Sequence, residues 1–388
     1  MKILILNTLY YPYKVGGAEK SVQLLAEDLR KTNQNVSVIS LTERSSYSDI
    51  INGVKVYYLT SKNIYWPYDI EKSNSSIKKI IWHVFDTYLN LQKKQIEQII
   101  LDEKPDVVHV NNITGFSTQI LKTLKNFNLP CIQTLRDYHY LCIKNTCYKN
   151  GNCVSLCKDC RITSTFKISQ LNKYVDHVVG ISDFIIGKHQ KHGLKKGIPT
   201  SVIYNAVKSL KIKEQLTFKK SKLIRFGYVG AITEAKGVED MFKKMSSHKL
   251  KRFQFEIKLA GVGSQDYIDN LKVNYGDLNI HFLGYQDSDK FFSNIDALIV
   301  PSLWEEPFGR IVIEGAQYHL PIFVSEHGAL PELKEKIQGI NFFNIKNIVQ
   351  FLESPVQINN KYSLEDFKSI TISKSYERIY TKLIENEN

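Results

Sequence analysis

The feature that most constrains the fold of this chain is the regular alternation of short apolar runs with amphipathic helical patterns. Some of the runs, such as 297–300, are apolar at every position, which is typical of strands covered on both faces of a sheet. Between the runs, apolar residues recur at helical spacing, as in Val22, Leu25, Ala26 and Leu29. Strands that alternate with helices in this way form parallel βαβ sheets.

The apolar runs fall into two series, and the 388 residues exceed the roughly 250–300 at which a single core stops growing. The first series comprises 2–7, 35–40, 54–59, 106–111, 131–135, 177–182 and 201–205. The second series comprises 223–230, 255–261, 279–284, 297–302 and 321–326. We therefore expect two doubly wound α/β domains, residues 1–205 and 206–370, joined by the lysine-rich segment 208–222, and a C-terminal helix over 371–388.

The positive charge of the chain is concentrated in one half. Residues 1–205 contain 27 basic and 16 acidic residues, a net charge of +11, whereas residues 206–388 contain 25 and 23, a net charge of +2. Such a basic half attracts nucleic acid, an anionic membrane or a phosphorylated substrate. The alternative is a solvated lysine-rich surface without a partner, because composition alone does not place the charges on one face.

Composition and segment lengths indicate a globular protein of the cytoplasm. The chain is 43% hydrophobic and 23% charged, a balance that argues against disorder. No apolar stretch approaches the length of about 18 residues that a membrane-spanning helix needs. The N-terminal apolar run is also too short for a signal peptide, so we expect a cytoplasmic location.

Five of the six cysteines lie close together, at positions 142, 147, 153, 157 and 160. In a reducing compartment such a cluster indicates a metal site more often than disulfides. The last two are spaced as in a zinc knuckle, whereas the wider spacing is not standard. We expect Cys142, Cys153, Cys157 and Cys160 to hold a structural zinc ion, with free thiols and disulfides as open alternatives.

A glycine-containing turn follows the first strand of each series and opens a helix. The first turn is Gly16-Gly17-Ala18-Glu19, and the second runs from Gly230 to Lys236-Gly237. Glycine lets the backbone approach a ligand, and free N–H groups at a helix start favour anions. With the Lys236 ammonium, the second turn is a candidate diphosphate site. Turn geometry alone is the alternative, because neither turn has the full dinucleotide fingerprint or a Walker lysine.

Two glutamates eight residues apart follow the buried run 297–300. Glu306 lies in a loop and Glu314 lies about two turns into the next expected helix, so both can reach one ligand. Carboxylates accept paired hydrogen bonds from the neighbouring hydroxyls of a sugar or ribose. Ordinary surface glutamates are the alternative, but the segment around Glu314 is otherwise apolar, and a buried carboxylate needs a partner.

These motifs, taken in order, resemble the family 4 glycosyltransferases of the GT-B fold, which are retaining enzymes that use nucleotide sugars. Glu306 and Glu314 match the E-x7-E motif of that family. Other segments match in the family's order: Gly16-Gly17-Ala18-Glu19, Val202-Ile203-Tyr204-Asn205, Gly230…Lys236-Gly237, Ala260-Gly261-Val262-Gly263, Phe282-Leu283-Gly284 and Gly328-Ala329-Leu330-Pro331-Glu332. No single motif is decisive, but the ordered set covers nearly the whole chain.

The resemblance implies that Glu314 binds the donor ribose, that Glu306 holds hydroxyls of the transferred sugar and that Lys236 neutralises the diphosphate. The family's usual arginine after the first glycine of the second turn is replaced here by Ala231, so we expect Arg310 to substitute for it. The other donor-binding residues that the resemblance implies are Gly17, Gly230, Gly261, Gly263, Phe308 and Gly309.

The segment from Thr134 to His139 is similar to the family's T-L-H-D-Y segment, with Arg136 in the usual histidine position. The resemblance implies that Arg136 and Asp137 face the acceptor or the donor sugar and take part in catalysis with Glu306 and Lys236. A structural ion pair between Arg136 and Asp137 is the alternative. His139 and Glu19 are expected to contact the acceptor.

The implied fold is two Rossmann-like domains facing across a cleft, with the C-terminal helix crossing back to the first domain. The first domain, with its cysteine-rich insertion at 142–160, would bind the acceptor, and the second would bind the nucleotide sugar. The implied reaction moves a hexose-type sugar from a UDP- or GDP-linked donor to a saccharide acceptor, without a catalytic cofactor.

The charge asymmetry adds an expectation about the acceptor. A lipid-linked diphosphate acceptor and an anionic leaflet are both negative, and each lysine near such a surface contributes about 1 kcal/mol. The segments 65–68 and 80–85 offer aromatic anchors, although ordinary core is the favoured interpretation of the second. We expect a peripheral enzyme of the inner face of the plasma membrane, acting in the synthesis of a surface polysaccharide such as capsule or O-antigen.

Two alternative functions remain open. A GT-B epimerase or hydrolase would act on the nucleotide sugar without an acceptor. A non-enzymatic protein that binds zinc and nucleic acid would use the basic charge and the cysteines. The basic residues form no compact run and the aromatic residues no stacking pattern, so we expect no nucleic-acid partner.

Overall fold

The structure is a computed structural model that describes residues 1–13, 16–68, 75–207, 223–355 and 363–386. It divides into two compact units, and the expected linker at 208–222 lies outside the described residues. The first unit comprises Met1–Cys147, Cys153–Lys208 and Asp366–Asn388. The second unit comprises Tyr148–Asn152 and Ser209–Glu365.

The first unit contains an eight-stranded sheet in the order β3-β4-β2-β1-β5-β6-β7-β8. All neighbouring strands are parallel except β3 and β4, which form an antiparallel edge. The strands are β1 (Lys2–Leu6), β2 (Asn35–Thr42), β3 (Tyr47–Ile51), β4 (Val54–Thr60), β5 (Val107–Val110), β6 (Cys131–Leu135), β7 (His177–Gly180) and β8 (Thr200–Val202).

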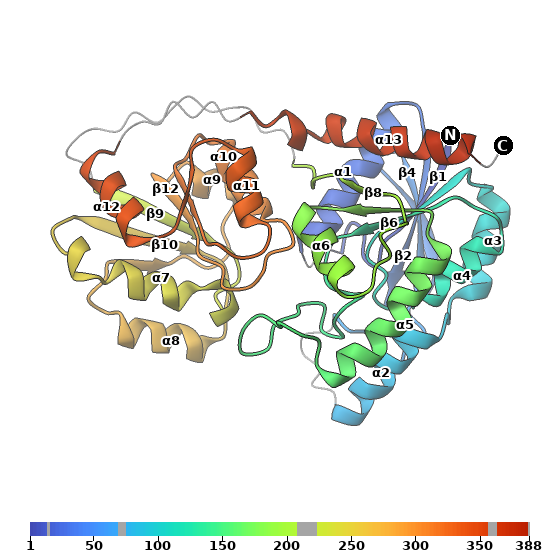
Figure 1. The fold of residues 1–388 in the computed structure, drawn as a ribbon, viewed down its shortest axis with the longest axis horizontal. Coiled ribbons are helices and arrows are strands. Elements are labelled where there is room, and N and C mark those ends of the chain that lie inside the picture. Colours follow the sequence, from blue (N-terminus) through green and yellow to red (C-terminus); the bar gives the residue numbers. More distant parts are fainter. Residues whose placement is uncertain (14–15, 69–74, 208–222, 356–362, 387–388) are drawn as a thin grey trace. The chain divides into compact units, whose positions relative to one another are not determined.

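The described part of the first unit contains seven α-helices, and most of them flank this sheet (Figure 1). They are α1 (Gly17–Lys31), α2 (Ser76–Tyr88), α3 (Lys93–Glu103), α4 (Gln119–Lys125), α5 (Lys158–Tyr174), α6 (Asp183–Lys191) and α13 (Ser369–Glu385). Helix α2 lies outside the sheet, against α5. Side chains of α1 and α13 pack on β1, β2 and β4 in one buried cluster. Successive residues of a strand point to opposite faces of the sheet, so only the strand residues on the side of these helices join the cluster. Helices α3, α4 and α5 contact one another in sequence order.

The C-terminal helix α13 is therefore part of the first unit. It packs against α1, and its Tyr376 and Tyr380 are buried in the core of that unit. His109 on β5 lies 2.7 Å from the hydroxyl of Tyr380 and, through its other ring nitrogen, 2.7 Å from Thr134 on β6. These contacts tie the last helix to the centre of the sheet.

The second unit contains a six-stranded parallel sheet in the order β11-β10-β9-β12-β13-β14. The strands are β9 (Ile224–Val229), β10 (Phe255–Ala260), β11 (Ile280–Phe282), β12 (Ala297–Val300), β13 (Ile322–Val324) and β14 (Ile340–Phe342). The helices are α7 (Val238–Met245), α8 (Gln265–Asn274), α9 (Ser288–Phe292), α10 (Arg310–Ala316), α11 (Leu330–Lys336) and α12 (Ile345–Glu353). Phe226, Phe323 and Phe351 meet edge to face in its core.

The prediction of two parallel α/β domains is confirmed, and every expected strand is present with small shifts at its ends. Two strands were not predicted. β3 is a mostly exposed edge strand whose apolar residues are interrupted by Ser48 and Asp49, and β14 has only three residues. A second difference is that Tyr148–Asn152, inside the cysteine-rich segment, groups with the second unit.

The two segments proposed as aromatic anchors differ from each other in the exposure of their side chains. Residues 65–68 are only partly exposed. In the second segment Trp82 is buried, but Ile80, Ile81 and Val84 are exposed, so the interpretation of this stretch as ordinary core is wrong for its outer face.

Candidate functional site

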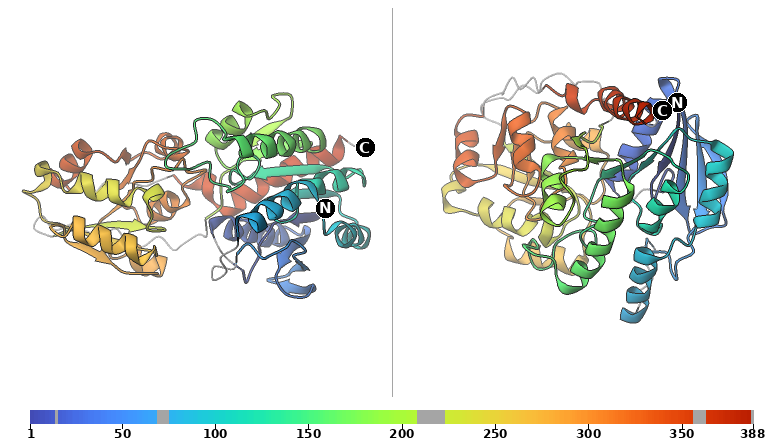
Figure 2. Two further views of the ribbon diagram at one scale, coloured as in Figure 1. Left: turned by 90° about the horizontal axis from the view of Figure 1, so that it is seen from below. Right: turned by 45° about the vertical axis from the view of Figure 1, so that its right-hand side comes forward.

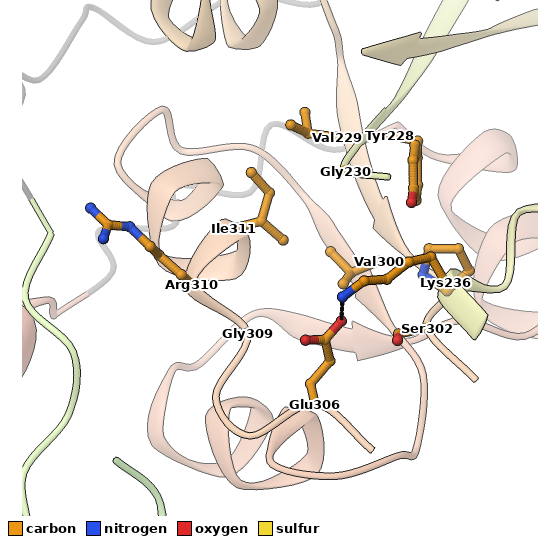
Figure 3. A pocket seen from close by; sticks show the side chains of 11 residues that line it. Tyr228, Val229, Gly230, Lys236, Val300, Ser302, Glu306, Gly309, Arg310 and Ile311 are labelled. Atoms are coloured by element: carbon orange, nitrogen blue, oxygen red, sulfur yellow. Dashed lines mark hydrogen bonds and ion pairs between the residues drawn. The ribbon is translucent and has the colours of Figure 1, made fainter. Parts of the chain in front are cut away.

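A pocket in the second unit opens where β9 and β12 end. This is the carboxyl edge of the parallel sheet, where α/β proteins bind ligands. The pocket is lined by Tyr228, Val229, Gly230, Lys236, Val300, Pro301, Ser302, Glu306, Gly309, Arg310 and Ile311 (Figure 3). Five of the residues expected to bind or process the donor are therefore brought together, namely Gly230, Lys236, Glu306, Gly309 and Arg310.

The Lys236 and Glu306 side chains meet at the pocket wall (Figure 3). The Lys236 Nζ atom donates to Glu306 Oε1 at 2.6 Å, and both side chains keep some exposure, 28% and 14%. The same ammonium lies 4.4 Å from the centre of the Trp304 ring, which favours a cation at this point. A positive and a negative group therefore stand side by side at the pocket wall.

Close contact between two loops fixes Lys236 at this place. Gly237, directly after it, has φ +72°, and a Cβ atom there would lie 2.0 Å from the Pro301 carbonyl oxygen. The backbone N–H groups of Leu303 and Trp304 both donate to the Ala235 carbonyl, at 3.0 and 2.8 Å. A larger residue than glycine would separate these loops, so the glycine of the motif serves the geometry of the site.

Gly261 and Gly263 are not among the residues that line the pocket. A Cβ at Gly261 would lie 1.8 Å from the Gly230 carbonyl oxygen, and one at Gly263 would lie 2.3 Å from that of Ile232. These glycines let the loop after β10 press against the loop that carries Gly230. Their predicted contact with the donor stays a prediction, and the structure gives them a supporting place behind the pocket.

Glu306 is supported by the loop before α11. A Cβ at Gly328 would lie 2.3 Å from the Glu306 backbone nitrogen, and the Ala329 N–H donates to the Glu306 carbonyl at 2.8 Å. Asn152 also contacts this loop: its amide donates to the Leu303 carbonyl at 2.7 Å and accepts from the Glu305 N–H at 2.9 Å. The backbone on both sides of the carboxylate is thus held by hydrogen bonds.

Arg310 and Glu314 pair with each other on α10. The Arg310 Nε atom donates to Glu314 Oε1 at 2.8 Å, and both side chains are largely buried. Glu314 is not among the pocket-lining residues, although its partner Arg310 is. Phe308 is buried beside them. The expected contact of Glu314 with a ribose stays a prediction and would require this ion pair to rearrange.

The residues expected to face the acceptor lie in the first unit, around Asp137. The Asp137 carboxylate accepts from the Asn112 side chain at 2.9 Å and from the His139 N–H at 2.8 Å. Burial raises the pKa of Asp137 to about 6, and the charge of Glu19 adds to the rise. The charges of Asp137 and Glu19 thus influence each other within the first unit, and the expected role of Asp137 toward the acceptor stays a prediction.

Glu19 stabilises the start of α1. Its Oε2 atom accepts from the Gly16 N–H at 2.9 Å and so caps the start of α1, directly before Gly17. The pocket described above lies in the other unit, and Gly17 is not among its lining residues. The roles expected for these two residues toward ligands stay predictions.

His139 and Arg136 are more deeply buried than expected. His139 lies 3.2 Å from Thr114 Oγ1 and 3.5 Å from Lys167 Nζ, and burial lowers the pKa of His139 well below its usual range. The Arg136 guanidinium donates to the side chains of Asn111 and Asn205. Both side chains thus stabilise the loops that follow β5, β6 and β8, and their contact with sugars stays a prediction.

A buried ion pair that no sequence pattern indicates lies next to these residues. Lys167 Nζ lies 3.7 Å from Asp86 Oδ2, and both side chains are 3% exposed. Lys167 also donates to the His139 carbonyl at 3.2 Å, and Asp86 accepts from the Gly115 N–H. Burial raises the pKa of Asp86 and lowers that of Lys167, while each charge opposes the shift of the other. Helical lysines are usually exposed, so nothing in the sequence marks Lys167.

Three of the clustered cysteines meet in the first unit. The thiols of Cys147 and Cys160 hydrogen-bond to the sulfur of Cys142, which lowers the pKa of Cys142 and raises those of the other two. Cys153 and Cys157 are more exposed. Over the described residues, which include all five, no three His, Cys, Asp or Glu side chains are placed to hold a metal ion. Structural zinc stays a prediction, which metal analysis of the purified protein tests.

Comparison with known proteins identifies the family. A family model described as glycosyl transferases group 1 matches residues 224–356. A curated protein of Klebsiella pneumoniae, described as an uncharacterized 42.6 kDa protein in cps region, is 36% identical over 383 residues, which cover 98% of this chain and 100% of that one. The chain belongs to the glycosyl transferases group 1 family. The resemblance found in the sequence motifs is thereby confirmed, and the protein is a glycosyltransferase.

Solved structures confirm the GT-B fold of this glycosyltransferase. It is similar to sucrose-phosphate synthase from Thermosynechococcus elongatus, with a TM-score of 0.74, 16% identity and 99% of each chain covered. It is also similar to HepE of Anabaena in complex with UDP-glucose, with a TM-score of 0.66, 16% identity and coverage of 98% and 100%. Among the helices that the structure describes, none is both long and apolar enough to cross a membrane.

Proposed function

We propose that this glycosyltransferase moves a hexose-type sugar from a nucleotide diphosphate donor to a saccharide acceptor, with retention of the anomeric configuration. The observation that carries the proposal is the side-by-side placement of Lys236 and Glu306, 2.6 Å apart, in a pocket at the end of β9 and β12. A nucleotide sugar carries its diphosphate next to its sugar hydroxyls. An ammonium and a carboxylate in one pocket offer a partner to each of these two neighbouring parts of one ligand.

Lys236 contributes to catalysis through charge. As the bond between the anomeric carbon and the phosphate oxygen breaks, negative charge grows on the diphosphate, and a fixed ammonium stabilises it. The acceptor oxygen bonds to the anomeric carbon from the same face, and its proton passes to the departing phosphate oxygen. Glu306 meanwhile leaves its partner Lys236 and accepts hydrogen bonds from the sugar hydroxyls.

The donor is best assigned to the uridine class. The structure of HepE was determined with UDP-glucose, and that protein shares the fold over nearly the full length of this chain. A guanosine diphosphate donor remains the second candidate, since similar scaffolds accept both nucleotides.

The proposed acceptor is a lipid-linked saccharide in the synthesis of a surface polysaccharide, at the inner face of the plasma membrane. Two observations support it. The Klebsiella relative is described as a protein in cps region, and the excess of positive charge lies in residues 1–205. A lipid-linked diphosphate and the leaflet that holds it are both anionic, so a basic acceptor unit suits them.

Separate substitutions in the pocket test the proposal. Glu314→Ala should weaken the binding of UDP in isothermal titration, while Glu306→Ala should mainly lower turnover of the nucleotide sugar. Lys243→Ala on α7, whose exposed side chain lies outside the pocket lining, is the matched control. Wild-type binding and turnover in both glutamate variants would overturn the assignment. Sugar release at the same rate with and without acceptor would indicate a hydrolase or epimerase instead.

A further inference from the structure

Helix α2 presents an apolar face to solvent. Ile77, Ile80, Ile81 and Val84 are 70%, 64%, 39% and 45% exposed. Their spacing of three, four and seven residues places them on one side of the helix. We call these four residues the α2 stripe. Such a run is unusual on a protein surface, where exposed apolar residues normally occur singly.

The opposite face of α2 holds the helix in place. Trp82 and Asp86 are both 3% exposed. The Trp82 indole donates to the Tyr65 carbonyl at 3.0 Å, and Asp86 pairs with Lys167 on α5. The orientation of α2 is therefore fixed by specific contacts on its polar and aromatic side. The outward position of the aliphatic side follows from that anchoring.

Basic residues lie in the first turn of α2, close to the stripe in sequence. Lys78 and Lys79 on α2 are exposed, and the one carboxylate of this helix, Asp86, is buried. Helix α5 contacts α2 and runs beside it in Figure 1. Its first two turns add the exposed Lys158, Arg161 and Ile162, together with one exposed carboxylate, Asp159. The exposed residues at the starts of these two contacting helices thus carry an excess of positive charge.

We propose that the α2 stripe, with Lys78, Lys79 and the start of α5, docks on the anionic surface of a lipid bilayer. Interfacial helices combine a buried aliphatic face with basic residues that contact lipid phosphates. The stripe lies on the convex outside of a helix, which suits a planar surface. Helix α2 lies along the outside of the first unit in the views of Figure 2.

Docking through the stripe would bring the membrane close to the residues expected to bind the acceptor. This interpretation rests on the proposed function. The inner face of α2 carries Asp86, whose partner Lys167 donates to the carbonyl of His139. The His139 N–H in turn donates to Asp137. An α-helix with its side chains is about 10–12 Å across. A bilayer against the stripe would therefore lie about one helix diameter from the Lys167 network, and the head group of a lipid-linked acceptor would enter beside Asp137.

Vesicle co-sedimentation tests the docking surface with the full chain. The vesicles contain phosphatidylcholine, with or without phosphatidylglycerol, at low and high salt. Replacing Ile77 and Ile80 together by Gln should lower the partition coefficient about tenfold or more, because each loses the burial of an aliphatic side chain. Lys78→Gln with Lys79→Gln should remove most of the preference for phosphatidylglycerol. Leu101→Gln, at an exposed apolar position on α3 in the same unit, is the control.

The outcomes separate this inference from the proposed function. Equal sedimentation of the isoleucine variant and the control would overturn the docking surface, and so would a wild-type dimer in sedimentation velocity that the variant abolishes. UDP titration should be unchanged in the α2 variants. If Glu314→Ala and Glu306→Ala both retain wild-type UDP binding and turnover while the vesicle results are as expected, the proposed function fails and the docking surface stands. If the glutamate variants behave as expected while the isoleucine variant sediments like the control, only the docking surface is overturned.

Discussion

The two units of this glycosyltransferase place their charged residues differently. The first unit buries Asp86 and Lys167 beneath the loop of Asp137, and both side chains are 3% exposed. The second unit keeps Lys236 and Glu306 at a pocket wall, where solvent reaches both. In the first unit the two charged side chains pair with each other and hydrogen-bond to backbone groups. In the second unit, the proposed function requires the pair to open when a ligand with complementary charges binds.

This difference has a physical reason. A buried ion pair rarely gains net stability over an apolar pair, but it fixes loops by directional bonds. A charged pair at a pocket keeps part of its hydration and can exchange partners, which binding of a diphosphate requires. We infer that the Asp86–Lys167 pair holds a shape, whereas the Lys236–Glu306 pair binds. The predictions below test this contrast.

The largest effect on stability should come from Lys167→Met. It leaves the buried Asp86 carboxylate without its cation and should lower the free energy of unfolding by about 3–5 kcal/mol at neutral pH. Urea unfolding measures this loss. The double variant Lys167→Met with Asp86→Asn should recover most of it, because the uncharged amide introduced by the second substitution can still accept from the Gly115 N–H through its oxygen. A double variant no more stable than the single one would show that this pair does not act as a unit.

Lys236→Met should affect activity and leave stability unchanged. A missing charge-stabilising donor typically lowers turnover by about 10²–10³. The rate of nucleotide release from the donor, in the presence of acceptor, measures this loss. Urea unfolding should match the wild type, because the pair with Glu306 is partly hydrated. If unfolding shifts as far as in Lys167→Met, Lys236 holds the fold and the contrast between the units is lost.

The sequence predicted the fold because both sheets are built from strands with continuous apolar runs, such as β12, whose four residues are all buried. It missed β3, because pairing with β4 at an edge needs no apolar residues, and β14, because three residues are too short to show a pattern. The sequence places segment 148–152 in the first domain, whereas in the structure it groups with the second unit, where Asn152 hydrogen-bonds to backbone that is distant in sequence.

The sequence was also informative about the pocket, because Gly230, Lys236, Glu306 and Gly309 lie in motifs that directly follow strands. It was silent about the Asp86–Lys167 pair. Both residues lie in helices at positions where a solvated charge is the ordinary expectation, and their burial depends on how α2 and α5 pack. The spacing of residues along the chain does not indicate tertiary packing of this kind.

The pH dependence of activity should report Asp137. Burial raises the pKa of Asp137 to about 6 from its usual 3.8, so the folded protein binds this proton more tightly than the unfolded chain does. The resulting stability is present below about pH 4 and is lost as pH rises through about 6. If the ionised carboxylate orients the acceptor, kcat/KM should rise up to tenfold per pH unit below 6.

Asp137→Asn tests this assignment. The variant should lose the limb near pH 6 and should be less sensitive to pH in its unfolding. Glu43→Gln, a substitution at an exposed position of the same unit, should change neither profile. A limb that persists in Asp137→Asn would belong to another group, and the acceptor role of this loop would then need a different residue.

The smallest effect is expected for an ion pair of the second unit that lies away from the pocket. Arg252 contacts Glu353, but the two side chains are 64% and 52% exposed. Exposed pairs of this type contribute about 0.2–1 kcal/mol, and salt screens them. Arg252→Gln should therefore shift urea unfolding far less than Lys167→Met, and the shift should vanish at high salt. Both pairs join a cationic side chain to a carboxylate, but one is buried and the other is exposed. A large, salt-resistant loss in Arg252→Gln would mean that burial does not decide what an ion pair contributes in this protein.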